Sequence, residues 1–424
     1  MDIGILFGTL FILLALSVPI GISLGVATAV TIFTCSHLPL VLIAQNAFTG
    51  MDSFPMLAIP FFMLSGSLMT YGGISRRIVD MAECFVGFIT GGLAMVTVVA
   101  CMFFGAISGS AAATVSAIGS FMVPMMVEKK YKPDFAAAVI SSAGTIGCII
   151  PPSIPFVVYG VLTGTSVSDL FIAGIIPGLT IGIALMLVSY VISKKEGYPR
   201  MSSIPTFKHV CKTFASSIWA LFVPVIILGG IYGGIFTPTE SAVVATVYAL
   251  LVGKFVYKEL NYEVTLTAFK DAVLVIGATL FMVGLATSFA SYLAMERIPI
   301  RVGGFILGYA SNKFIVLLLM NIVFLVIGCF VDNISSTIIL TPIFLPIVKE
   351  LGMDPIQFGM MISIALAIGF STPPYGCNLF ISATISKQSV GAIAKRLVPF
   401  ILAMIVCLQL FTYIPWFSLV LLGR

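Results

Sequence analysis

Apolar runs long enough to cross a lipid bilayer recur along almost the entire chain, and they constrain the fold more than any other feature. Such runs fill most of residues 3–422, and about 20 apolar residues in a helix span a hydrocarbon core about 30 Å thick. Only 9% of the residues are charged, whereas a soluble domain carries about 25%. In lipid every backbone polar group must be hydrogen-bonded internally, so the sequence predicts an all-α polytopic membrane protein.

Most of the apolar segments are predicted to cross the membrane. These crossings lie near residues 3–34, 54–71, 136–162, 171–193, 214–236, 240–257, 271–294, 357–386 and 397–421.

Two further apolar segments, 92–126 and 314–348, are predicted to be re-entrant helical hairpins. Each has two arms interrupted by a polar or glycine-containing tip, at 108–110 and 328–335. Arms of about 15 and 16 residues reach only about 24 Å, which is short for a crossing. The stretches that precede the hairpins mix charged and apolar residues and are expected to be interfacial helices. They are residues 74–85 and 296–310.

The basic residues divide unequally between the two sides of this layout. Sixteen fall on one side: Arg76, Arg77, Lys129, Lys130, Lys132, Lys194, Lys195, Arg200, Lys208, Lys212, Lys254, Lys258, Lys270, Lys387, Lys395 and Arg396. Five fall on the other: Arg297, Arg301, Lys313, Lys349 and Arg424. Because cytoplasmic loops carry the excess of lysine and arginine, the first side is expected to be cytoplasmic.

The N-terminal run has two possible topologies. A single crossing by residues 3–34 would place the N-terminus in the cytoplasm and the C-terminus outside, but Pro19 could break the run. The run lacks a basic leader and is too long for a secretory signal, so no cleaved precursor is expected.

The rest of the composition favours no soluble activity. The net charge of +5 is spread over short loops and is not gathered on a nucleic-acid-binding surface. The two histidines, His37 and His209, lie in or beside loops. The cysteines show no C-x-x-C spacing; they are Cys35, Cys84, Cys101, Cys148, Cys211, Cys329, Cys377 and Cys407. We therefore expect no disulfide framework, no transition-metal site and no enzyme activity.

The prolines reveal an internal repeat with an offset of 222 residues. Five prolines have a second proline 222 positions later, whereas random placement would give about 0.5 such pairs. The pairs are Pro124 with Pro346, Pro133 with Pro355, Pro151 with Pro373, Pro152 with Pro374, and Pro177 with Pro399. Four crossings and a hairpin separate the two Pro-Pro pairs, so the second copy is expected to run opposite to the first. Inverted repeats with broken helices are typical of secondary transporters, which bind substrate and coupling ions at the breaks.

Each Pro-Pro pair interrupts an apolar run, within residues 144–153 and 369–378. Two successive prolines remove two amide donors and prevent a regular helix. The backbone carbonyls freed there need a partner, and oxygen ligands suit a small hard cation such as sodium. We therefore expect two cation sites, with the tip at 108–110 facing the first break and the tip at 328–336 facing the second. The half-helices after the tips direct positive dipole ends inward, which suits a carboxylate substrate.

Polar residues at the second tip and at the breaks are candidates for substrate contact. They are Ser153, Asp332, Asn333, Ser335, Ser336 and Asn378. Asp332 is the one acid at a hairpin tip, and an intramembrane carboxylate is functional by default. It could instead lie at the external surface or cap the following half-helix, and the neutral residues could equally be helix caps. Glycine and proline could also simply kink helices, but two matched breaks beside matched hairpins favour binding sites.

Several motifs resemble the large membrane subunit of the tripartite ATP-independent periplasmic (TRAP) transporters, and the likeness covers nearly the whole chain. They are Ala58-Ile-Pro-Phe-Phe-Met-Leu-Ser-Gly66, Phe104-Gly-Ala-Ile-Ser-Gly-Ser-Ala-Ala-Ala-Thr114, Ile150-Pro-Pro-Ser-Ile154, Ala173-Gly-Ile-Ile-Pro-Gly178, Gly233-Gly-Ile-Phe-Thr-Pro-Thr-Glu-Ser-Ala242 and Leu340-Thr-Pro-Ile-Phe-Leu-Pro346. The chain looks most like the sialic-acid branch. The resemblance implies sodium-driven import of a small organic acid, such as sialic acid (N-acetylneuraminate), across a bacterial inner membrane by an elevator movement. It also implies two partners, a small four-helix membrane subunit and a periplasmic substrate-binding protein.

The resemblance further implies site residues and domains. The family's sodium sites would map onto Ser108, Ser110, Thr145, Cys148 and Pro151, and onto Gly328, Gly369, Thr372 and Tyr375. The implied domains are scaffold helices at 1–71 and 194–294, interfacial arm helices at 72–92 and 295–313, the first repeat at 93–193 and the second at 314–424. The alternative is a secondary transporter of C4-dicarboxylates or other carboxylates that needs no binding protein.

Other functional classes are less well supported by the residues. No Walker-type motif for ATP is present, although a partner could supply one. A hydrolase built on Ser108 or Ser110 would need a histidine or lysine at membrane depth to act as its base, and none is expected there. A channel would need polar rings along a pore, not two isolated breaks. Glu240 is expected only to cap the helix that it begins.

Overall fold

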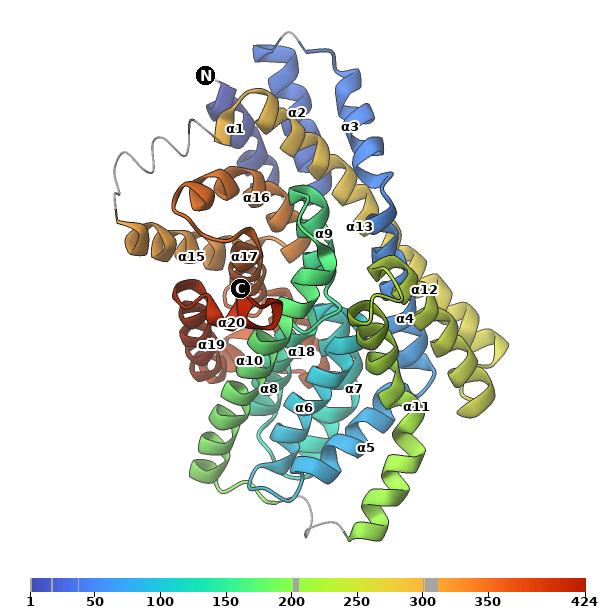
Figure 1. Cartoon of the computed structure of the whole chain (residues 1–424). Helices are drawn as coiled ribbons and strands as arrows, with labels where there is room; N and C mark the ends of the chain where they lie inside the picture. Colours follow the sequence, from blue (N-terminus) through green and yellow to red (C-terminus); the bar gives the residue numbers. More distant parts are fainter. Residues whose placement is uncertain (1, 17, 37, 201–205, 300, 302–311) are drawn as a thin grey trace.

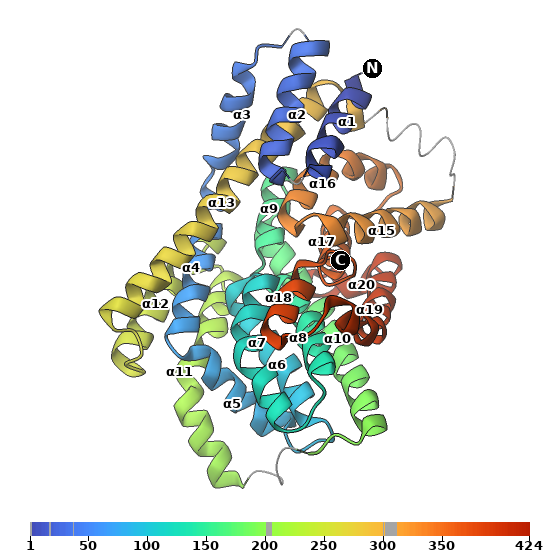
Figure 2. The same ribbon diagram turned by 180° about the vertical axis from the view of Figure 1, so that it is seen from behind.

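Helices make up nearly all of the computed structural model, which describes residues 2–16, 18–36, 38–200, 206–299, 301 and 312–424 (Figure 1, and from behind in Figure 2). Within these ranges the one strand-like pairing is an isolated bridge between Thr90 and Arg200. The helices are α1 (Asp2–Ala15), α2 (Ile20–Cys35), α3 (Val41–Met51), η1 (Phe54–Leu57), α4 (Ala58–Tyr71), α5 (Ile74–Val86), α6 (Gly92–Ser108), α7 (Ala111–Glu128), α8 (Pro133–Gly144), η2 (Thr145–Cys148), α9 (Ile154–Thr163), α10 (Val167–Glu196), α11 (Phe207–Tyr232), α12 (Pro238–Leu251), η3 (Val252–Val256), α13 (Tyr262–Met295), α15 (Lys313–Phe330), α16 (Asn333–Glu350), α17 (Pro355–Gly369), α18 (Cys377–Ser386), α19 (Val390–Tyr413), α20 (Trp416–Leu419) and η4 (Val420–Leu422).

The predicted all-α polytopic membrane fold is confirmed. In the described ranges, eight helical stretches are long and apolar enough to cross a bilayer by length and composition. They are Phe54–Tyr71, Ala111–Glu128, Val167–Glu196, Phe207–Tyr232, Pro238–Val256, Tyr262–Met295, Lys313–Phe330 and Val390–Tyr413.

The N-terminal run forms two helices, so the prediction of a single crossing at 3–34 is wrong. Pro19 has no amide hydrogen with which to continue α1, and it occupies the N-cap of α2 with a ψ of 137°. The start of α1 and the end of α2 lie at the same end of the molecule (Figures 1 and 2). Ser36 lies just after α2, and Glu296 lies just after α13. The Ser36 Oγ donates a 3.3 Å hydrogen bond to Glu296 Oε1, so the ends of these two helices lie together. The chain therefore starts on the side opposite to the one that is rich in lysine and arginine.

Two other segments differ from the sequence prediction. Helix α3 was not predicted, because its 11 residues are fewer than the roughly 20 that a membrane crossing needs. The crossing expected at 397–421 ends at Tyr413, because Pro415 favours an extended Ile414, which has φ −118° and ψ 95°. The predicted interfacial helix at 74–85 is α5, whereas most of the one expected at 296–310 lies outside the described residues.

The repeat found in the prolines extends to the helix boundaries. Helices α7 and α16 both contain 18 residues, and their starts and their ends are each separated by 222 positions. Helices α6 and α15 also end 222 positions apart, and α8 and α17 start 222 positions apart. The two halves therefore repeat a unit of hairpin, broken helix and long helix.

Ion pairs at the two ends of α10 show that the repeats are inverted. At its start, Asp169 lies 3.7 Å from Arg424 Nη2, and Arg424 Nη1 lies 3.7 Å from Asp354, the N-cap of α17. At its end, Glu196 pairs with Arg396, whose Nε lies 3.0 Å from Asp134 in the first turn of α8. Since α10 is a 30-residue helix about 45 Å long, α8 and α17 begin at opposite ends of the molecule.

Replacing Arg396 with glutamine is expected to lower the melting temperature of the purified protein by about 1–3 °C. The change leaves two partly buried carboxylates, Asp134 and Glu196, without their shared guanidinium, at a cost of about 1–3 kcal/mol. Differential scanning fluorimetry in detergent measures the effect. The matched control is Lys395→Gln, an exposed position on the same turn, which should change the melting temperature by less than about 1 °C. Equal changes in melting temperature in the two variants would contradict a stabilising role for the ion pairs of Arg396 with Asp134 and Glu196.

The hairpin arms are longer than predicted. Helices α6, α7, α15 and α16 contain 17, 18, 18 and 18 residues, and α7 and α15 are long enough to cross a bilayer. Arm length therefore does not identify these segments as hairpins. The tip itself is the stronger sign, because Ser108 and Gly109 are buried inside the protein, which is where non-helical backbone at membrane depth is tolerated.

Candidate functional site

The first hairpin tip packs against the first broken helix through backbone atoms. Gly109 has a φ of +63°, and its carbonyl oxygen accepts a 3.2 Å hydrogen bond from the amide of Ile154, the first residue of α9. A Cβ on Gly109 would lie 2.9 Å from the Pro152 carbonyl oxygen, and a Cβ on Gly105 would lie 2.9 Å from Gly147 Cα. The tip expected to face the first break does so, and only glycine allows the approach.

Hydroxyl and carbonyl oxygens gather at this first contact. Ser108 Oγ lies 3.1 Å from Thr114 Oγ1, which donates to the Ser110 carbonyl oxygen over 2.8 Å. Ser108 and Thr114 are buried, and Ser110 is the N-cap of α7. A cluster of neutral oxygens beside a helix break is the kind of ligand set that sodium accepts.

The second tip meets the second break in the same way. A Cβ on Gly369 would lie 2.7 Å from the Gly328 Cα, and a Cβ on Gly328 would lie 2.7 Å from the Leu366 carbonyl oxygen. Thr372 donates from its Oγ1 to the Ile368 carbonyl oxygen over 2.7 Å, which leaves the lone pairs of Thr372 Oγ1 available. Tip and break therefore form a matched pair in each repeat.

The breaks interrupt the helices where the sequence predicted. After α8 the chain tightens into the single turn η2 and resumes as α9, and after α17 it resumes as α18. The Pro151-Pro152 and Pro373-Pro374 bonds are both cis. Since the prolines donate no amide hydrogen, the carbonyls of the preceding turns are not all used by helix bonds.

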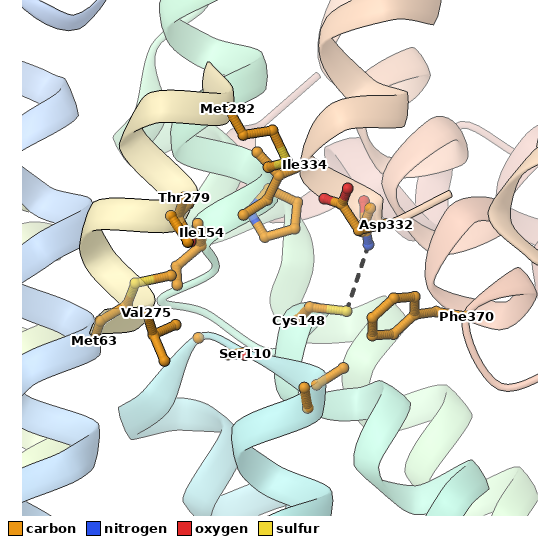
Figure 3. Close-up of a pocket in the computed structure, with 16 residues that line it drawn as sticks. Met63, Ser110, Cys148, Ile154, Val275, Thr279, Met282, Asp332, Ile334 and Phe370 are labelled. Carbon is orange, nitrogen blue, oxygen red and sulfur yellow. Dashed lines mark hydrogen bonds between the residues drawn. The ribbon is translucent and has the colours of Figure 1, made fainter. Parts of the chain in front are cut away.

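A cavity of about 280 Å³ lies between the two tip–break pairs (Figure 3). Its lining residues are Met63, Gly109, Ser110, Ala111, Ala112, Cys148, Ile154, Pro155, Val275, Ala278, Thr279, Met282, Asp332, Asn333, Ile334 and Phe370. In Figure 3 Met63, Val275 and Thr279 lie on one side, and Asp332 and Phe370 lie on the other. Among these described lining residues none is lysine, arginine or histidine, and Asp332 is the one charged side chain.

Three helices begin at the cavity wall, namely α7, α9 and α16. Helix N-termini carry about half a positive charge each and present free amide groups. The wall opposite is formed by one face of α13, where residues 275, 278, 279 and 282 line the cavity at the spacing of a single helix face. These N-termini favour a small anion at the cavity wall, although no basic side chain is among the described lining residues.

Asp332 both lines the cavity and caps the helix that follows. Its Oδ2 accepts from the Ser335 amide over 3.0 Å, and its Oδ1 accepts from Ser335 Oγ over 2.6 Å. The capping alternative considered for Asp332 is thus correct, although it does not remove the carboxylate from the cavity. Asn333 donates from its Nδ2 to Cys148 Sγ over 3.6 Å, which is the contact dashed in Figure 3.

The other four substrate candidates do not line the cavity. Ser153 donates to the Cys148 carbonyl oxygen over 2.6 Å, and Ser335 packs on Met282 Sδ at 2.7 Å. Ser336 Oγ and Asn378 Oδ1 are buried with no hydrogen-bond partner. Ser153 and Asn378 belong to the two breaks, and Ser335 and Ser336 lie in the first turn of α16, just after the second tip.

The sodium candidates are likewise divided. The first tip–break contact includes four of them, Ser108, Ser110, Thr145 and Cys148. The second contact includes three, Gly328, Gly369 and Thr372. Pro151 is buried in the first break. Tyr375 is different, because it is 61% exposed and its ring packs against Phe330 with centroids 5.6 Å apart. Only its backbone could then contribute to a site inside the protein.

Sequence reasoning missed three sets of residues that the structure places at the site. Thr114 lies four residues after a tip serine, and no spacing rule marks it. Ser371 was included in the second break but was given no role, and it bonds Thr145 in the other repeat. The α13 wall was predicted only as an ordinary crossing. The apolar residues on one face of α13 can be recognised in the sequence, but the sequence does not show which other helices that face contacts.

Two inverted repeats, each with a hairpin tip set against a broken helix beside a shared cavity, define a polytopic secondary transporter fold. The chain belongs to the family described as the DctM component of the tripartite ATP-independent periplasmic transporters, whose sequence profile matches residues 7–417. The predicted family membership is confirmed. Members of this family and the relatives below are permeases and not enzymes, and they are membrane proteins.

Curated relatives carry several different substrate names. The chain is 44% identical over 97% of its length to the isethionate TRAP transporter permease protein DctMQ of Oleidesulfovibrio alaskensis, and it spans 65% of that protein. It is 40% identical to the C4-dicarboxylate large permease DctM of Pseudomonas aeruginosa, over 94% of this chain and 93% of that one. It is 37% identical to the sialic acid large permease SiaM of Vibrio cholerae, over 99% and 98%. The sialic-acid branch is thus not singled out.

A solved structure has the same overall fold. The crystal structure of the Alcanivorax borkumensis YdaH transporter superposes with a TM-score of 0.64, covering 88% of this chain and 87% of that one. The sequence identity is 14%, so this likeness concerns the fold alone.

Proposed function

We propose that this chain is the large membrane subunit of a sodium-coupled transporter that imports a small organic acid across a bacterial inner membrane. One observation carries the proposal: the two tip–break pairs flank a single cavity that is walled by three helix N-termini and by Asp332. The N-termini suit the anionic substrate, and the tip oxygens suit the cation.

The charge balance of the cavity supports coupling to a cation. An organic anion about 5 Å from the Asp332 carboxylate would be repelled by about 3 kcal/mol at an effective dielectric constant of about 20. No basic side chain among the described lining residues offsets this repulsion. A sodium ion at a tip–break contact would contribute an attraction of similar size, so the anion would bind well only when the cation is also bound.

The size and chemistry of the cavity support a small organic acid as the substrate. Sialic acid is the substrate expected from the resemblance, while relatives named for isethionate and C4-dicarboxylates give smaller alternatives. A volume of about 280 Å³ lies just below the range of about 300–1,000 Å³ that is usual for small-molecule sites. This size favours a small acid over a sugar acid.

The proposed mechanism is an elevator in which residues 93–193 and 314–424 move against the scaffold at 1–71 and 194–294. The cavity supports it, because one wall comes from the tips and breaks while the other comes from α4 and α13. The contact of Ser335 Oγ with Met282 Sδ would be one that breaks during the movement. A small membrane subunit and a periplasmic substrate-binding protein are the proposed partners.

Uptake of radiolabelled acids into proteoliposomes tests the proposed function. The vesicles contain this chain and the small subunit, with the binding protein outside, and isethionate, succinate and sialic acid are compared. We expect an inward sodium gradient to raise initial uptake of one acid at least about 10-fold over equal potassium. We also expect omission of the binding protein to abolish that uptake. Equal uptake in potassium would reject sodium coupling, and full uptake without the binding protein would reject the tripartite arrangement.

A further inference from the structure

A buried serine in the second break hydrogen-bonds to the first break. Ser371 Oγ lies 2.9 Å from Thr145 Oγ1, and both residues are completely buried. Ser371 also donates to the Ser141 carbonyl oxygen over 2.8 Å and accepts from Asn378 Nδ2 over 3.0 Å. One hydroxyl thus joins α8, η2 and the start of α18, which belong to different repeats.

The number of protons and the contact distances together set the direction of these bonds. A serine hydroxyl has one hydrogen and two acceptor positions. Ser371 uses its hydrogen on the Ser141 carbonyl oxygen at 2.8 Å. Thr145 Oγ1 lies 3.4 Å from the same carbonyl oxygen but 2.9 Å from Ser371 Oγ, so Thr145 donates its hydrogen over the shorter contact, to Ser371. The lone pairs of Thr145 Oγ1 are then free, as a cation ligand requires.

The same serine orients the amide of Asn378. Because Asn378 Nδ2 donates to Ser371, its Oδ1 points elsewhere, and this oxygen is buried without a hydrogen-bond partner. A buried amide oxygen that lacks a donor is costly unless another group, such as a cation, satisfies it. Ser371 therefore prepares one candidate oxygen ligand in each repeat.

A second contact joins the same turn to the second hairpin. Cys148, at the end of η2, receives a hydrogen bond from Asn333 Nδ2 over 3.6 Å, and Asn333 also donates to the Ser363 carbonyl oxygen over 3.4 Å. Both ends of η2 are thus fixed by polar groups of the other repeat. An ion that orders η2 would also order the second tip and break.

We propose that Ser371 is a positioning residue that couples the two cation sites, so that filling one site orients the ligands of the other. This inference rests on the proposed sodium coupling. It predicts that sodium binds cooperatively to the wild-type protein and that cooperativity depends on the Ser371 hydroxyl. Ser371 itself needs no contact with either ion.

The test is a sodium titration of the purified full chain in detergent, read as the melting temperature, with choline chloride holding ionic strength constant. We expect a sigmoidal rise for the wild type, with a Hill coefficient above 1. Ser371→Ala should lower the Hill coefficient to about 1 and raise the half-saturating sodium concentration about 10-fold. Ser371→Cys, which fills the same space with a weak donor, should behave like the alanine variant and serves if alanine impairs folding.

Ser382→Ala is the matched control. Ser382 is equally buried, lies in α18 and donates only to the Leu379 carbonyl oxygen of its own helix, so its titration should follow the wild type. A wild-type Hill coefficient in Ser371→Ala would overturn the coupling role while leaving sodium binding in place. A wild-type protein whose melting temperature does not respond to sodium would instead overturn the proposed function itself, and with it this inference.

Discussion

Replacing Gly369 with alanine is expected to reduce sodium-dependent uptake by more than about 100-fold. The added Cβ would lie 2.7 Å from the Cα and carbonyl carbon of Gly328 and from the Leu325 carbonyl oxygen. All three are backbone atoms, which cannot rotate away as a side chain does. The second tip must then separate from the second break, and the oxygens of that contact no longer face one ion.

Initial uptake in proteoliposomes measures this effect, and the melting temperature of the same preparation shows whether the variant is folded. Gly391→Ala is the control, because an added Cβ at that helical glycine would meet nothing within 4 Å. The control should retain wild-type uptake, since alanine is also the better helix former. Wild-type uptake by a folded Gly369→Ala variant would show that the close approach of tip and break is not needed for transport.

The double change Ser108→Ala with Thr372→Ala is expected to raise the half-saturating sodium concentration for uptake by about 100-fold. Each change removes one hydroxyl from one tip–break contact, and a bond between a neutral group and an ion contributes about 1.5–3 kcal/mol, or about 10-fold or more. Ser108 Oγ sits among the oxygens of the first contact, and Thr372 Oγ1 has lone pairs free at the second.

Measuring initial uptake against sodium concentration, with each single variant beside the double, separates the two sites. Thr384→Ala is the control, because Thr384 is an exposed residue of α18 that donates only to the Phe380 carbonyl oxygen. It should leave the sodium dependence unchanged. If the double variant keeps the wild-type sodium dependence, neither hydroxyl is a ligand, and the ions must bind elsewhere.

The features that could be predicted from the sequence are those that proline and glycine impose locally. A Pro-Pro pair ends a helix in any surroundings, so both breaks and their 222-residue offset were visible before any contact was known. The division of the first apolar run was not predicted, because Pro19 is compatible either with a kinked crossing or with a reversal. That choice depends on how α1 and α2 pack, which a pattern of apolar residues does not record.

The site was predicted less completely than the fold. Residues at the tips and breaks were identified because the chain itself marks them, whereas the role of Ser371 depends on Thr145, which lies 226 positions away. Nothing in the sequence distinguishes α13 as the opposite wall, since several other crossings are equally apolar. Long-range partners of single polar residues require the three-dimensional arrangement.

The glycine contacts at the two tips restrict where this fold can acquire a new cargo. Backbone touches backbone at Gly105 with Gly147 and at Gly328 with Gly369, so these positions tolerate almost no chemical variety. Side chains in the first turns of the half-helices and along the facing wall of α13 carry no such restriction. Relatives named for acids as different as isethionate and sialic acid can thus diverge in selectivity at those side chains while the backbone of the proposed ion sites stays the same.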